Sequence, residues 1–166
     1  KTGTFSSRGD ILALGTLDVR AGQGLLNRGS LKRTGNTSLF TAGGILDSDG
    51  IVYTEGSLTF DAAAGIKSAG VVQANNAIRY SARAGGIVSA GKMVTQKGIT
   101  FSAGGGVLAD GVIQAGDGIA VTGSSFGNKS DMQARGGIAL NTPSPFGNSG
   151  ALRAQSPLLL SLIPTR

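Results

Sequence analysis

The chain of 166 residues contains neither cysteine nor histidine, so it has no disulfide framework and lacks the commonest zinc ligand. Hydrophobic residues make up 40% of it, which argues against disorder, and no apolar run approaches the length of a membrane span. Its 15 lysines and arginines against 9 acidic residues give a net charge of +6, which favours solubility.

A repeat of about twenty residues runs along the chain. The apolar residue that opens each unit is found at Leu17, Leu39, Leu58, Ile78, Ile99, Ile119, Ile138 and Leu158. The steps between these starts are 22, 19, 20, 21, 20, 19 and 20 residues. A fixed period of this size is typical of a solenoid, in which each unit covers its neighbour and none folds alone. Residues 1–16 are expected to be part of one more coil.

Each unit opens with a segment in which alternate residues are apolar. Positions one and three are expected to face the core, and in the second unit these are Leu39 and Thr41, with Phe40 facing outward. The fifth position is small and closes the segment. The third position carries an aromatic ring in three consecutive units, which predicts a buried ladder of Phe60, Tyr80 and Phe101.

Two further apolar contacts follow in each unit. One is expected at Ile45, Ile66, Ile87, Val107, Phe126 and Phe146. The other comes two residues after a glycine slot, which is filled by Gly29, Gly50, Gly70, Gly91, Gly111, Ser130 and Gly150. Four residues after that slot the side chain is small, except at Arg33. Three short strands separated by turns are therefore predicted in each unit.

These features predict a right-handed parallel β-helix of about eight coils of roughly 20 residues, in which residues 1–166 form a single segment excised from a longer filament. Glycine, at 29 residues, disfavours helices, and no helical stripe is found. A leucine-rich horseshoe has a similar period, but its consensus is missing. Calcium-binding nonapeptide coils are also not indicated, because their glycine–aspartate pattern is missing.

The clearest copy of the unit, residues 99–118, reads apolar-x-apolar-x-Ala-Gly-Gly and later Gly-apolar-apolar-x-Ala. This pattern, over about residues 17–157, resembles the repeats of filamentous haemagglutinin and related two-partner-secretion exoproteins, including the stick proteins of contact-dependent growth inhibition. The segments 124–128 and 144–148 depart from it, and a different corner is expected in those coils.

The resemblance implies a shaft segment of a large adhesin or effector-delivery exoprotein, exposed at or secreted from the surface of a Gram-negative bacterium. It also implies an outer-membrane two-partner-secretion transporter as the partner in export. The alternative function is direct adhesion, in which a basic face binds sulfated glycans or another anionic host surface. Arg79, at an outward strand position, and Arg83 are the candidate residues for that face.

A second adhesion candidate is the tripeptide Arg8, Gly9 and Asp10, which can engage integrins when it is exposed on a loop. The simpler interpretation is a turn before the next strand, as at Asp110-Gly111. An enzyme is not expected, because there is a single glutamate, no histidine, and no second acid one coil away from Asp47 and Asp49. No catalytic residue, metal site, cofactor, membrane span or nucleic-acid partner is predicted.

Overall fold

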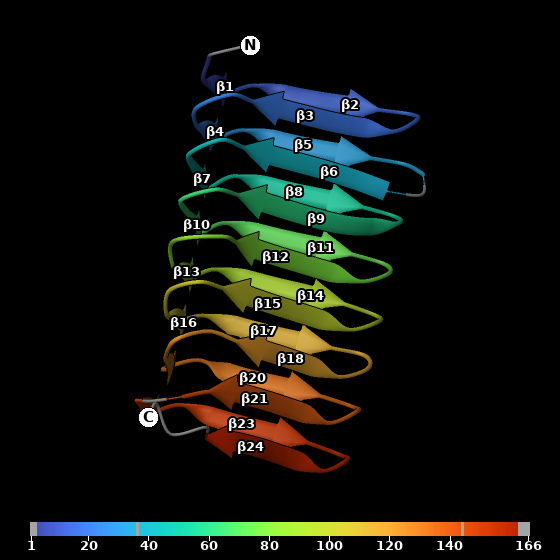
Figure 1. The fold of residues 1–166 in the computed structure, drawn as a ribbon. Helices are drawn as coiled ribbons and strands as arrows, with labels where there is room; N and C mark the ends of the chain where they lie inside the picture. The colour runs from blue at the N-terminus through green and yellow to red at the C-terminus, as the bar shows by residue number, and fades with distance from the viewer. Residues whose placement is uncertain (1–2, 36, 144, 163–166) are drawn as a thin grey trace.

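A computed structural model describes residues 3–35, 37–143 and 145–162. Every regular element in these ranges is a β-strand, and the strands wind into a stack of coils (Figure 1). Each coil gives one strand to each of three 8-stranded parallel sheets, which we call A, B and C in the order that the chain visits them. The predicted parallel β-helix is therefore confirmed, and the coils are numbered 1–8 from the N-terminus.

The strands of each sheet recur once per coil. Sheet A contains β1 (Phe5–Ser7), β4 (Leu25–Asn27), β7 (Ile45–Ser48), β10 (Gly65–Ser68), β13 (Ile87–Ser89), β16 (Val107–Ala109), β19 (Phe126–Asn128) and β22 (Phe146–Asn148). Sheet B contains β2 (Asp10–Ala13), β5 (Ser30–Arg33), β8 (Ile51–Thr54), β11 (Val71–Ala74), β14 (Lys92–Thr95), β17 (Val112–Ala115), β20 (Asp131–Ala134) and β23 (Ala151–Ala154). Sheet C contains β3 (Leu17–Ala21), β6 (Thr37–Ala42), β9 (Ser57–Ala62), β12 (Ile78–Ala82), β15 (Ile99–Ala103), β18 (Ile119–Thr122), β21 (Ile138–Thr142) and β24 (Leu158–Leu162).

Side chains at equivalent positions stack directly over one another. In sheet C, Ile78 pairs with Leu58 on one side and with Ile99 on the other. The hydrogen-bonded ladder continues through the corners, where the Ala90 N–H donates to the Ser68 carbonyl at 2.8 Å and the Lys92 N–H to the Gly70 carbonyl at 3.0 Å. Because the turns also pair, few backbone groups between neighbouring coils depend on water.

The interior is a column of buried, mostly apolar side chains contributed by alternate residues of all three sheets. Phe60, Tyr80 and Phe101 are buried as predicted, with ring centroids 4.8 Å apart for the first pair and 5.7 Å apart for the second. Phe40 extends the ladder at its N-terminal end, 5.3 Å from Phe60. The Tyr80 hydroxyl lies 3.0 Å from the Ser68 Oγ of the same coil, so the one polar ring in the column keeps a partner.

The expected phase of the second unit is wrong by one residue. Ser38 and Phe40, not Leu39 and Thr41, face the interior, because Ser38 pairs with Leu17 and Phe40 with Val19. Both Leu39 and Phe40 are apolar, so alternation alone does not choose between them. The larger ring is buried, where it removes more apolar surface from water and meets the aromatic column.

The apolar contact expected at Ile45 has the same error, in β7 of the next coil. Leu46 pairs with Ile66 and is fully buried, whereas Ile45 is 53% exposed. Arg33, the exception at the small position of sheet B, also lies inside the stack, where its Nε donates to the carbonyl of Gly15 in the coil above. Its Nη1 is also buried and has no hydrogen-bond partner among the described residues.

The two irregular segments stay in register with the rest of the stack. Phe126 pairs with Phe146 in sheet A, and Asn128 pairs with Asn148. The different corner expected for segment 124–128 is found, because β18 ends at Thr122, one residue earlier than β15 relative to its start. For segment 144–148 the strand β21 keeps its full length, and Ser144 lies outside the described residues.

Candidate functional site

The tripeptide Arg8-Gly9-Asp10 forms the corner between sheets A and B in coil 1. Its residues are exposed, and Asp10 is the first residue of β2. The Gly9 carbonyl accepts hydrogen bonds from the Ser30 N–H at 3.3 Å and from the Ser7 hydroxyl at 3.2 Å. Gly9 therefore begins the glycine column that Gly29 and Gly50 continue, and the tripeptide forms a corner of the same kind as theirs. The position agrees with the turn interpretation, and integrin engagement by the exposed tripeptide stays a prediction.

The two arginines of the expected basic face differ in their surroundings. Arg79 is exposed on β12 between Thr59 and Thr100, and no ion pair involves it within the described ranges. Arg83 lies at the corner after β12, and its Nη2 is 2.7 Å from the Asp61 Oδ2 of the preceding coil. This ion pair offsets the charge of Arg83 locally, and glycan binding through Arg79 and Arg83 stays a prediction.

Other charges on the surface are paired in the same way from coil to coil. Arg28 of the preceding coil reaches both Asp47 and Asp49, at 2.9 and 3.1 Å. Lys97 pairs with Asp117 at 3.8 Å. Exposed pairs of this kind contribute about 0–1 kcal/mol each, so they align charges more than they stabilise the fold.

A column of small polar side chains inside sheet A was not predicted. It is formed by the last residues of the sheet A strands, with exposed Asn148 at the C-terminal end and Ala109 as the apolar exception: Ser7, Asn27, Ser48, Ser68, Ser89, Asn128 and Asn148. The signal was present in the sequence, since a serine or asparagine stands two residues before most of the glycine slots. Asn27 shows what the column does: its Oδ1 accepts from the Gly29 N–H at 3.2 Å, and its Nδ2 donates to the Ser48 hydroxyl at 3.2 Å.

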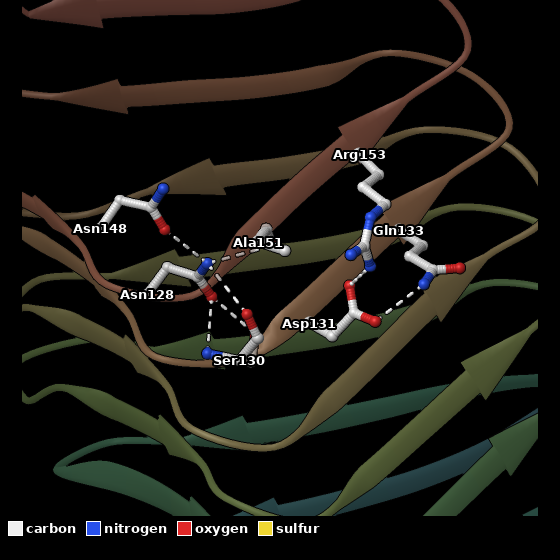
Figure 2. Close-up of polar contacts among 7 residues, drawn as sticks. All are labelled: Asn128, Ser130, Asp131, Gln133, Asn148, Ala151 and Arg153. Carbon is white, nitrogen blue, oxygen red and sulfur yellow. Dashed lines mark hydrogen bonds and ion pairs between the residues drawn. The ribbon is translucent and has the colours of Figure 1, made fainter.

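The most connected member of this column is Asn128 (Figure 2). Its Oδ1 accepts from the N–H and the hydroxyl of Ser130, at 3.1 and 2.6 Å. Its Nδ2 donates to the Asn148 Oδ1 at 2.8 Å and to the Ala151 carbonyl at 3.3 Å. One buried amide thus closes the corner of coil 7 and joins it to coil 8. All of these bonds are internal, and this arrangement positions backbone without presenting a reactive group.

Neither a protein-family model, nor a curated protein, nor a solved structure matches this chain significantly. Within residues 3–35, 37–143 and 145–162, histidine, cysteine, aspartate and glutamate form no group of three or more that could hold a metal ion. A search of the same residues for helices able to cross a membrane finds none.

Proposed function

We propose that this chain is a structural shaft segment of a large secreted or surface-exposed filament of a Gram-negative bacterium, an adhesin or effector-delivery exoprotein. Its work is mechanical, because it holds a distal module away from the cell. The observation that carries the proposal is the unbroken register of three parallel sheets through every coil. An export partner in the outer membrane, of the two-partner-secretion type, belongs to the same proposal.

The packing supports a mechanical role. Stretching the stack along its axis pulls against the ladders of all three sheets at once, corners included. At about 4.8 Å per coil, eight coils extend a distal module by roughly 40 Å. Interdigitated rings from four coils oppose sliding between layers, because each ring is held between its neighbours.

The proposal is tested by changing the length of the shaft within the exported protein. Removing residues 78–137 deletes three whole coils. Ile138 then takes the place of Ile78 and pairs with Leu58. We expect export to continue and the filament to shorten by roughly 14 Å, three times the spacing of neighbouring strands. Surface labelling of bacteria and electron microscopy of the filament measure the two quantities.

A deletion that is not a whole number of coils is the control. Removing residues 78–128 joins the segment after β11 directly to the corner before β20. Both strands belong to sheet B, so no strand of sheet C closes that coil. We expect this variant to lose the folded filament. Equal behaviour of the two deletions, or a cytoplasmic location of the whole protein, would overturn the proposal.

A further inference from the structure

A shallow hollow runs along the outer face of sheet B over coils 5–8. It has a volume of about 920 Å³. One wall is formed by outward-facing side chains at the third position of the sheet B strands, among them Gln114 and Gln133. The other wall is the first corner residue after each strand, which carries Gln96, Arg135 and Gln155. The hollow follows the axis of the stack, so it fits an extended chain better than a compact molecule.

Glutamine is concentrated in this hollow. The whole chain has six glutamines, and four of them line it: Gln96, Gln114, Gln133 and Gln155. Stacked amides can bond to one another as a ladder, which would explain them structurally. Gln114 and Gln133 are paired in register, yet no hydrogen bond joins their side chains in the described part of the chain. The Gln133 Nε2 donates instead to the Asp131 Oδ2 at 2.9 Å, beside Arg153 (Figure 2).

The notch in the corner wall is enforced by backbone packing. Gly116 stands between Gln96 and Arg135, and a Cβ at Gly116 would lie 1.9 Å from the Gln96 carbonyl oxygen. No side chain can fill this place without moving the neighbouring coil. Glycine therefore leaves the corner wall of the hollow without a side chain between Gln96 and Arg135.

The charges around the hollow leave one cation unpaired. Lys97 is paired with Asp117, and Arg153 with Asp131. Arg135 is exposed, and none of the ion pairs among the described residues includes it. A guanidinium binds a carboxylate through two parallel N–H donors, and amides both donate to and accept from hydroxyls.

From this arrangement we infer that the hollow binds an extended polysaccharide that carries carboxylates, with Arg135 on a carboxylate and Gln114 on sugar hydroxyls. The site lies on sheet B, whereas Arg79 lies on sheet C. The inference goes beyond the shaft role and does not rest on it, since a shaft without this site remains a shaft.

Titration calorimetry of the full chain with oligogalacturonate tests the inference, with dextran of similar length as the neutral control. Oligogalacturonate is expected to bind saturably and dextran much more weakly. The substitution Arg135→Ala should weaken binding about tenfold and Gln114→Ala about fivefold, which are the effects of losing a charged and a neutral hydrogen bond. Unchanged thermal midpoints show that both variants are folded.

Two matched substitutions separate the site from general charge attraction. Gln73→Ala removes the same side chain at the same strand position of β11, outside the hollow, and Arg79→Ala removes an exposed arginine of sheet C. Both should leave affinity unchanged. The inference is overturned if oligogalacturonate does not bind, if dextran binds equally well, or if Arg79→Ala weakens binding as much as Arg135→Ala.

Discussion

Glycine fills the corner between sheets A and B in most coils because the carbonyl of the neighbouring coil lies under it. A Cβ at Gly91 would be 1.9 Å from the Gly70 carbonyl oxygen, and a Cβ at Gly70 would be 1.9 Å from that of Gly50. A left-handed backbone is not the reason, since Gly35 is the glycine with such a φ in the described ranges. Ser130 occupies the same column where Asn128 binds its hydroxyl.

We expect Gly91→Ala to lower the free energy of unfolding by about 1–3 kcal/mol, the usual cost of forcing an extra carbon into a packed site. Gly147→Ala is the control, because a Cβ there meets nothing within 4 Å. Denaturant unfolding of the two variants measures the difference. Equal stability of both would contradict the close approach of the coils.

Tyr80 makes the stability of the folded chain depend on pH in the alkaline range. Burial raises the pKa of its hydroxyl above the ordinary value of 10.0, and the hydrogen bond with Ser68 offsets only part of this effect. The phenol is neutral in both states below pH 10. Above it, the unfolded chain ionises first, so the folded state holds more protons and loses stability as pH rises.

The loss of folding stability caused by Tyr80 should reach about 1.4 kcal/mol per pH unit above pH 10. Tyr80→Phe removes this contribution, so the stability difference between the two proteins should shift in favour of the variant between pH 10 and 12. Denaturant midpoints at each pH measure it. Parallel pH profiles would show that the ring is not buried as described.

At the scale of the strand and its corner, asparagines of the polar column of sheet A hydrogen-bond to the backbone of the turn that follows them. Asn27 and Asn128 accept the backbone N–H two residues later and so hold the chain as it leaves sheet A for sheet B. A short side chain that binds backbone nearby favours turns over continued strand. In these two coils the asparagine therefore ends the sheet A strand from inside the core.

Asn128→Ala should cost about 1–3 kcal/mol, because it leaves buried donors and acceptors of coils 7 and 8 without partners. Asn141→Ala, an exposed position of β21 in the same coil, should change stability by no more than about 0.5 kcal/mol. Thermal unfolding compares them. A small effect at Asn128 would mean that water replaces its bonds.

For the molecule as a whole, each inner coil is covered by a neighbour on both faces, and coils 1 and 8 have one neighbour within the described chain. The inward residues show the difference: Leu158 of coil 8 is 45% exposed, whereas its equivalents Leu58 and Ile99 are buried. Stability in a stack is a sum of contacts between neighbours, so it should decline toward the ends.

Hydrogen exchange of the 166-residue chain should reveal this gradient. Amides of β12 and β15 are expected to be protected most, and those of β24 to exchange first, because opening coil 8 breaks a single interface. Uniform protection along the chain would show that the stack opens only as one unit. Mass spectrometry after partial exchange resolves the coils.

The period and the alternation along the chain were enough to predict the coil, the parallel stacking and the burial of Phe60, Tyr80 and Phe101. Both follow from local geometry, since a strand points successive side chains to opposite faces and a solenoid repeats its contacts. Local pattern does not set the phase where neighbours are both apolar, as at Leu39 and Phe40. There the tertiary structure decided, because only the adjacent coil shows which side chain meets the ring of Phe60.

The same limit applies to charge and to the corners. Pairing of Arg83 with Asp61, and of Arg28 with Asp47, depends on which residues the winding places one coil apart. The hydrogen bonds of Asn128, and the close approach of Gly91 to the Gly70 carbonyl, also join residues about twenty positions apart. Composition and spacing determined what kind of fold this chain adopts. Which side chains touch was decided by the stacking of coils, because contact between them is made only after the chain has turned once around the core.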